Sequence, residues 1–354
     1  MTTRVWIATL SSLFLWACAS DARETGAPMN APAGSAGSAS TAQATSTPMA
    51  SPVISADETW TDGKMIPANV DIDIASGAKV QIAPGAMISV APGASITVHG
   101  SLAAASKDDH VKLSGSNWKG IVVAGGGSLA LQGVDIEGAK VAIQVNAGNV
   151  AAAYDYGTIT GGSFKVDANA TLTTDHAAFK QGGFSFVSGT LNASFLDYSG
   201  AGIALGDANA EVFVADSKIS GVGGDFFTAN GGKLLHVEYT TIDNTHCPFH
   251  FNAISKFEID HVTTGGMATA STSAYGLMLY NADAGPHTIS YSNFYDPSWE
   301  QTRPTAVINV TNTFIRNVSA KAGQVTFMPA DSNGNNAHTT PNTDALPRGM
   351  PGPG

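Results

Sequence analysis

Apolar and polar positions alternate with a fixed spacing between residues 75 and 98. This stretch divides into three blocks of eight residues, which begin at Ala75, Ala83 and Ala91. Each block opens with a glycine-containing turn and closes with alternating β-branched residues, as at Ile88 and Val90. A period of two indicates a short strand with one buried face. Three such strands in about 24 residues predict one turn of a coil that is built from strands.

The pattern continues less regularly towards the C-terminus. An inward apolar residue recurs about every 20 residues, and a second apolar column lies seven positions before it. The inward residues are Ile136, Ile159, Phe179, Tyr198, Ile219, Ile242, Phe294 and Phe314, and the second column is Leu129, Ala152, Leu172, Leu191, Val212 and Leu235. We therefore predict an all-β solenoid with three parallel sheets around one apolar core and roughly 11–12 coils.

Two further columns complete the predicted coil. A turn column lies two positions after the inward residues and consists of Gly138, Gly161, Gln181, Gly200, Gly221 and Asn244. Glycine and asparagine tolerate the positive φ that tight turns require. A third strand face carries apolar triplets such as Phe226-Phe227-Thr228 and Phe249-His250-Phe251, which place His250 outward between two inward phenylalanines.

The repeat is interrupted between about Thr263 and Tyr291. The polar segment 265–273 predicts a protruding loop, and long loops on rigid scaffolds are often functional. We therefore expect any functional site to lie where the period breaks, between about Asp225 and Tyr295, rather than in the regular blocks.

The chain divides into four predicted regions. Residues 1–17 form a targeting segment, in which Arg4 precedes an apolar run that is too short to span a bilayer. Residues 18–56 are rich in Ala, Ser, Gly and Pro and predict a flexible tether. The solenoid occupies 57–328, and the Pro-, Gly- and Asn-rich segment 329–354 is predicted to be disordered.

Composition limits the partners. The net charge is −11 and charged residues make up 13% of the chain, which argues against nucleic acid and against electrostatic docking on anionic lipid. The acidic balance leaves Ca²⁺ possible, although no motif supports it. We expect Cys247, beside Pro248 and Phe249, to be a small buried residue rather than a reactive thiol.

The end of the targeting segment, Leu15-Trp16-Ala17-Cys18, resembles a bacterial lipobox. This resemblance implies that Cys18 carries a diacylglyceryl thioether and that the preceding segment is removed. Ala19 stands where inner-membrane retention signals usually place Asp, so the resemblance implies a lipid anchor in the outer membrane or at the cell surface. The alternative is a plain secretory signal.

The N-terminal part of the solenoid resembles right-handed parallel β-helix repeat proteins. The resemblance rests on the three blocks, the run Gly100–Ala104, a polar break and the run Trp118–Val123. Proteins of this kind include bacterial surface lipoproteins and pectate-lyase-like enzymes. The resemblance implies a right-handed coil and either a structural, adhesive or glycan-binding role or an activity on polysaccharides as a lyase, hydrolase or epimerase.

Candidate chemistry gathers in the irregular region. The catalytic candidates are Asp243, His246, His250 and Lys233, and the ligand-binding candidates are Asp225, His236, Tyr275 and Tyr280. An acid–base mechanism would need a carboxylate, a histidine and a basic residue at one point, whereas tyrosines can stack on sugar rings. Two histidines fall short of the three or four ligands of a zinc site, so we predict no metal centre. One alternative is an ordinary solvated surface without a site, and another is a surface protein as the partner in place of a polysaccharide.

Overall fold

The computed structural model describes one part of the chain in detail. The described residues are 51–328, without 147, 149, 222, 266–274, 284, 296–298, 302–305, 316–319 and 322–323, together with Arg348. They lie in one compact unit, Met49–Gly354. The signal segment, Cys18 and all of the predicted tail except Arg348 lie outside them.

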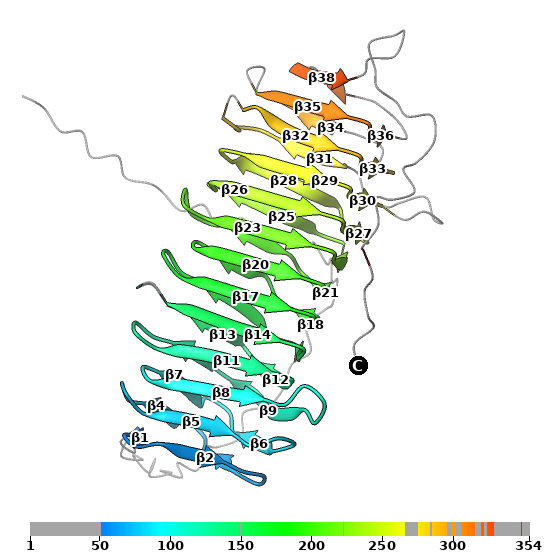
Figure 1. Ribbon diagram of the computed structural model, residues 1–354. Helices are drawn as coiled ribbons and strands as arrows, with labels where there is room; N and C mark the ends of the chain where they lie inside the picture. The colour runs from blue at the N-terminus through cyan, green and yellow to red at the C-terminus, as the bar shows by residue number, and fades with distance from the viewer. Residues whose placement is uncertain are drawn as a thin grey trace, which may run out of the picture. The chain divides into compact units, whose positions relative to one another are not determined.

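All regular secondary structure in the described ranges is β-strand, and every third strand joins the same sheet (Figure 1). Sheet A contains thirteen strands. They are β1 (Val53–Ile54), β4 (Asp71–Ile74), β7 (Ser95–Val98), β10 (Gly120–Val123), β13 (Val141–Val145), β16 (Ser163–Val166), β19 (Ser185–Val187), β22 (Ile203–Leu205), β25 (Asp225–Asn230), β28 (Cys247–Ala253), β31 (Leu277–Leu279), β34 (Trp299–Gln301) and β37 (Ala320–Lys321).

Sheet B also contains thirteen strands. They are β2 (Glu58–Trp60), β5 (Lys79–Ile82), β8 (Ser101–Ala105), β11 (Ser128–Gln132), β14 (Ala151–Asp155), β17 (Thr171–Asp175), β20 (Thr190–Ser194), β23 (Glu211–Ala215), β26 (Leu234–Glu238), β29 (Phe257–Asp260), β32 (His287–Ser290), β35 (Val307–Thr311) and β38 (Gln324–Met328).

Sheet C contains twelve strands. They are β3 (Met65–Ile66), β6 (Met87–Val90), β9 (Val111–Trp118), β12 (Val134–Ala139), β15 (Thr158–Thr160), β18 (Ala178–Gly182), β21 (Asp197–Gly200), β24 (Lys218–Gly221), β27 (Thr241–Asp243), β30 (Thr263–Thr264), β33 (Asn293–Phe294) and β36 (Phe314–Ile315).

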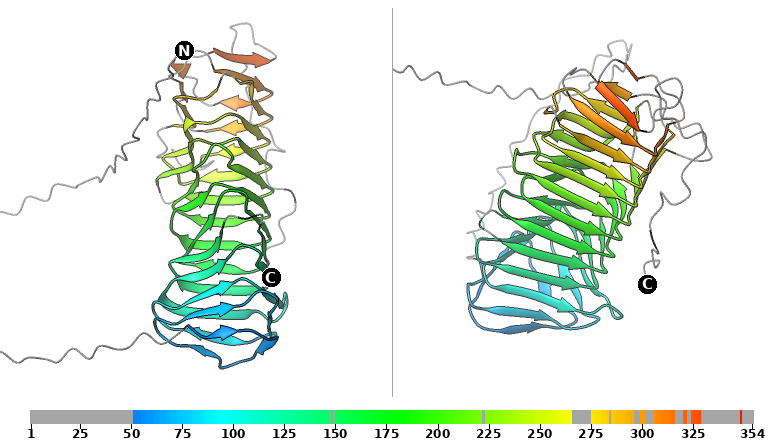
Figure 2. Two further views of the ribbon diagram at one scale, coloured as in Figure 1. Left: turned by 90° about the vertical axis from the view of Figure 1, so that its left-hand side faces the viewer. Right: turned by 45° about the horizontal axis from the view of Figure 1, so that its top comes forward.

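All strand pairs are parallel, and the views in Figure 2 show one coil following the next from the first strands to the last. The predicted all-β solenoid of three parallel sheets is therefore confirmed. Its right hand, which the resemblance implied, stays a prediction. The described part of the chain holds no helix with the length and apolar character of a membrane span.

The three eight-residue blocks form one strand in each sheet. They end in β5, β6 and β7, so a single coil contains all three. Gly77, Gly85 and Gly93 have φ values of 87°, 68° and 74° in the turns before these strands. Residues with a Cβ rarely adopt such φ values, which explains why glycine recurs at this position.

The predicted apolar columns form the core. Leu129 and Ala152 are register partners in sheet B, and the column continues through Leu172, Leu191, Val212 and Leu235. All of these side chains are buried, as are the inward residues from Ile136 to Phe294. The last inward residue was predicted wrongly, because Phe294 pairs with Ile315 and Phe314 is half-buried.

Two other predictions need correction by one position or more. Ile203 pairs with Phe227, so the repeating triplet in β25 begins at Phe227 and not at Phe226. Both phenylalanines are nevertheless buried. In the predicted turn column, Gly138, Gly161, Gln181 and Asn244 have positive φ. The column members Gly200 and Gly221 instead pair within β21 and β24.

The hydrogen-bonded coil begins before residue 57, where the sequence placed the start of the solenoid. Val53 and Ile54 of β1 pair with Asp73 and Ile74 of β4. The last strand ends at Met328.

Loss of a core ring should destabilise the coil strongly. Phe227 is 0% exposed and stacks on Phe249 with ring centroids 5.8 Å apart. Phe227→Ala should lower the free energy of unfolding by about 3–5 kcal/mol, because it leaves a cavity in the buried core. Phe186 lies in the same sheet and is 51% exposed, so Phe186→Ala should change stability by about 0.5 kcal/mol or less. Denaturant unfolding of both variants measures the difference, and equal losses would contradict the assignment of the core.

Candidate functional site

Five of the eight candidate residues meet on the outer side of sheet A. Asp225 lies in one coil, His246 and His250 lie in the next, and Tyr275 and Tyr280 lie in the coil after that. We call these five residues the Asp225 cluster. Residues that are far apart in sequence come together here because neighbouring coils lie only about 4.8 Å apart.

Local strand geometry places the carboxylate and the two histidines. Asp225 is the first residue of β25 and pairs with Cys247 at the start of β28. His246 directly precedes β28, and its backbone N–H donates to the carbonyl of Gly224 at 2.8 Å. Within β28, Phe249 and Phe251 are buried, so the alternation turns His250 outward as predicted.

Both histidines hydrogen-bond to the same carboxylate. Nδ1 of His246 lies 3.1 Å from Oδ1 of Asp225, and Nδ1 of His250 lies 2.5 Å from Oδ2. An ionised carboxylate only accepts hydrogen bonds, so each Nδ1 carries the hydrogen that it donates. His246 is the more accessible of the two, with 48% of its side chain exposed against 20% for His250.

One tyrosine ring lies beside each histidine. The ring of Tyr275 packs edge-on to His246 with centroids 5.8 Å apart, and Tyr280 is tilted against His250 at 5.5 Å. The backbone N–H groups of Tyr275 and Tyr280 donate to the carbonyls of His246 and Phe251. The strand pairing that continues the coil therefore also fixes the two rings.

Opposing effects set the charge of Asp225. Burial raises the pKa of its carboxyl group, but the hydrogen bonds and the charges of His250 and His246 outweigh burial, so the net pKa is lowered. The group is consequently ionised over the ordinary pH range and can orient both imidazoles.

The other three candidates lie elsewhere. His236 lies in sheet B, where its Nδ1 contacts Glu258 at 2.9 Å, and Lys233 pairs with Glu211 at 2.8 Å. Asp243 ends β27 in sheet C. The convergence of Asp243, His250 and a basic residue that an acid–base mechanism would need is therefore not found. Within the described ranges, Oδ1 of Asp243 is buried without a hydrogen-bond partner.

The described ranges contain no group of three or more His, Cys, Asp or Glu side chains that could hold a metal ion. They also assign no residues to the Ca²⁺ that the sequence left open. Cys247 is buried as predicted, and its thiol donates to the carbonyl of Phe249 at 3.1 Å.

Sequence reasoning missed a second polar group, which consists of Asp216, Tyr239 and Arg348. Asp216 and Tyr239 lie three positions before the inward residues Ile219 and Ile242, so the spacing of the repeat could have identified these two residues. Arg348 contacts Asp216 from the segment that was predicted to be disordered. No repeat position indicated that contact.

Neither a protein-family model, nor a curated protein, nor a solved structure matches this chain. The chemistry of the site must therefore be argued from its own residues. The Asp225 cluster offers a carboxylate acceptor, two imidazoles and two aromatic rings, and it suits hydrogen bonding and stacking on a polar, ring-shaped ligand.

The lowered pKa of Asp225 predicts a pH-dependent contribution to stability. The unfolded chain binds a proton more readily at this carboxyl group, so the contribution is complete above about pH 3.9 and is lost as pH falls through the folded-state pKa. Asp225→Asn should lower the free energy of unfolding by about 1–3 kcal/mol at pH 7. Denaturant unfolding from pH 7 to pH 2.5 should show the gap between wild type and variant closing below about pH 3.9. A gap that stays constant over this range would contradict the prediction.

Proposed function

We propose that this chain is a lipid-anchored surface protein that binds glycans through the Asp225 cluster. The single observation that carries the proposal is the convergence of Asp225, two histidines and two tyrosines from three successive coils. Sugars combine hydroxyl groups, which hydrogen-bond to carboxylates and imidazoles, with apolar ring faces that pack on aromatic rings.

The charges favour neutral sugars over uronates. The ion pairs of Asp225 are with His246 and His250, and the whole chain carries a net charge of −11. An acidic sugar would bring its carboxylate towards Asp225, whose ion pairs in the described ranges are with histidines and not with the arginine or lysine that usually neutralises a uronate. Neutral hexose or N-acetylhexosamine chains avoid this repulsion. Pectin and alginate, the acidic polymers suggested by the resemblance to pectate-lyase-like enzymes, are therefore poorer candidates.

Substitutions in the Asp225 cluster should weaken sugar binding. The probes are malto-, cello-, manno- and N-acetylglucosamine oligosaccharides, titrated calorimetrically into the full chain in detergent. For the probe that binds, Asp225→Asn or Tyr280→Ala should raise the dissociation constant at least about tenfold, which corresponds to about 1.4 kcal/mol. The first change weakens polar contacts to the ligand, and the second removes a stacking surface.

His99 and Asp73 provide the matched control. They form the same type of pair at sheet A, in a distant coil: Asp73 lies in β4, His99 directly follows β7, and Nδ1 of His99 lies 2.8 Å from Oδ1 of Asp73. His99→Ala should leave the dissociation constant unchanged. The glycan proposal fails if none of the probes binds, or if His99→Ala weakens binding as much as Tyr280→Ala does.

A catalytic role is the second candidate. The 2.5 Å contact between Asp225 and His250 favours it, because a carboxylate that holds one imidazole nitrogen can orient a histidine for proton transfer. Release of new reducing ends from the oligosaccharide that binds, abolished in His250→Ala, would support hydrolysis over binding alone. Unchanged oligosaccharide after prolonged incubation would leave the binding role.

The anchor proposal rests on the sequence around Cys18. The Leu15–Cys18 motif, the following Ala/Ser/Gly/Pro-rich segment and the parallel solenoid together support a bacterial lipoprotein at the outer membrane or cell surface. Burial of acyl chains contributes roughly 0.8 kcal/mol per CH₂ group, so a multiply acylated Cys18 would hold the protein stably. We also retain the right-handed β-helix as the proposed form of the coil.

Lipid labelling tests this anchor directly. Cells that express the full chain and are fed radioactive palmitate should label the wild-type protein but not Cys18→Ala, because that change removes the thiol that is acylated. The control is Cys247→Ala, which alters the other cysteine of the chain and should retain the label. Label on Cys18→Ala would exclude this cysteine as the attachment site.

A further inference from the structure

Outward side chains form a column at the turns between sheets B and C. From β14 to β35, the residue after each strand of sheet B has a φ between 45° and 56°. We call these residues the turn column. They are Tyr156, His176, Phe195, Asp216, Tyr239, His261, Tyr291 and Asn312. Because each strand pairs in register with the next, the side chains of successive coils lie above one another.

Aromatic rings stack in two runs of this column. The centroids of Tyr156 and His176 are 4.7 Å apart, and those of His176 and Phe195 are 4.4 Å apart. The second run joins Tyr239, His261 and Tyr291 at 4.5 and 4.9 Å. These distances match the rise of one coil, about 4.8 Å. The stacking therefore uses the same spacing as the backbone ladder.

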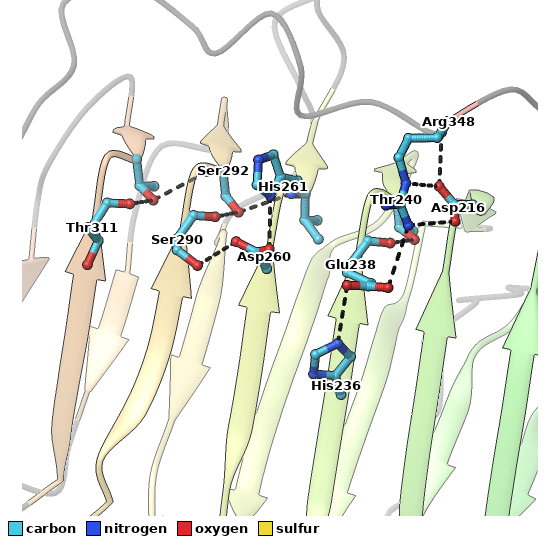
Figure 3. A network of polar contacts seen from close by, with 12 residues as sticks. Asp216, His236, Glu238, Thr240, Asp260, His261, Ser290, Ser292, Thr311 and Arg348 are labelled. Carbon is cyan, nitrogen blue, oxygen red and sulfur yellow. Dashed lines mark hydrogen bonds and ion pairs between the residues drawn. The ribbon is translucent and has the colours of Figure 1, made fainter.

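Asp216 interrupts the stacking between Phe195 and Tyr239. Its carboxylate replaces a ring at this level, and the residue as a whole is only 7% exposed. The guanidinium group of Arg348 lies against it, with Nε 2.8 Å from Oδ1 and Nη2 3.0 Å from Oδ2 (Figure 3). The backbone N–H of Arg348 also donates to Oδ1 at 3.0 Å.

Arg348 also makes contacts that resemble those of the missing ring. Its Cζ lies 3.5 Å from the centroid of Tyr239, and Nη2 lies 3.7 Å from Oε1 of Glu238. A guanidinium group is planar, donates two parallel hydrogen bonds and stacks on aromatic rings. A lysine ammonium group carries the same charge, but it has neither a planar surface that stacks on the ring nor two parallel N–H donors. The geometry is therefore selective for arginine.

The electrostatics of the contact favour a cation. The hydrogen bond to Asp216 is the main reason that the pKa of Arg348 is raised. Arg348 is nevertheless 55% exposed, whereas the side chain of Asp216 is 10% exposed. The coil thus provides the buried anion, and the arginine lies over it from the solvent side.

We propose that Asp216, Glu238 and Tyr239 form an arginine-binding site at the break in the turn column, and that the chain fills this site with its own Arg348. The contact joins residues 132 positions apart and holds Arg348 at the turns after β23 and β26. Displacement of Arg348 would open the site to an arginine side chain of another peptide.

A peptide supplied in trans tests the site. The probe is a fluorescein-labelled peptide of residues 343–353, and the receptor is the full chain with Arg348→Ala, measured by fluorescence anisotropy. This receptor should bind the peptide at least tenfold more tightly than the wild-type chain does, because Arg348 competes in the wild type. A peptide with lysine in place of arginine should bind at least tenfold more weakly than the arginine peptide. Equal binding of the two peptides would overturn the proposal.

Two receptor variants locate the binding. Asp216→Asn in the Arg348→Ala chain should abolish binding of the arginine peptide. Lys218→Ala, two positions further along the chain at the start of β24, is the control and should leave the affinity unchanged. Because a change at Asp216 can disturb the turn, the comparison of the two peptides on one unaltered receptor tests the site independently of folding.

Hydrogen exchange and light scattering test the attachment in cis. In the full chain, Arg348→Ala should accelerate amide exchange in the peptide fragment that contains position 348. Light scattering should show that the wild type is a monomer at all concentrations. A wild-type dimer that dissociates in Arg348→Ala would show that the arginine comes from a second copy. Equal amide exchange in the wild type and in Arg348→Ala would contradict the binding of Arg348 to Asp216 within one chain.

Discussion

In-register pairing of parallel strands is the constraint on which the rest of the structure depends. Each residue lies about 4.8 Å from its counterpart one coil away, so side chains combine along columns that cross the sequence. The core follows this rule through columns such as Leu129 to Leu235. Outside the core, the Asp225 cluster draws on three successive coils. The rings of the turn column stack with the same spacing, so the distance between neighbouring coils sets the arrangement of both the core and the surface.

The sequence predicted the columns best where their chemistry is uniform. Leu129, Ala152 and their successors are all apolar and could be aligned without a structure. The turn column contains Tyr, His, Phe, Asp and Asn, which share a positive backbone φ but no side-chain chemistry. The sequence pattern therefore did not indicate this column, although its members lie three positions before the inward residues. Proximity in sequence also misled, because Asp243 and His246 are near neighbours in the chain but Asp243 ends a strand of sheet C and His246 leads into sheet A. Asp225 and His250, which are 25 positions apart, are in contact.

Histidine bonded to a carboxylate is a general feature of this coil and does not by itself mark a site. In the described ranges, seven histidines contact a carboxylate through Nδ1: His99, His110, His176, His236, His246, His250 and His261. Most of these pairs bridge neighbouring coils or lie within a turn and help to fix a solvated surface. Asp225 differs because two histidines share it. A carboxylate with several partners converging from different coils is better suited to a ligand than an isolated pair.

The break at Asp216 shows how a repeat can acquire a specific contact. An aromatic ring there would continue the stack and would interact with any flat apolar group. The carboxylate replaces this general attraction with a preference for a cation. The ring of Tyr239 adds a preference for a planar cation, which can stack on it. Arginine meets both conditions, and Arg348 supplies it. Specificity in this solenoid therefore arises where one position departs from its column, because the neighbouring coils still hold the altered position in a fixed frame. Asp225 is held in a similar frame, because it opens β25 and meets histidines that the next coil holds in place.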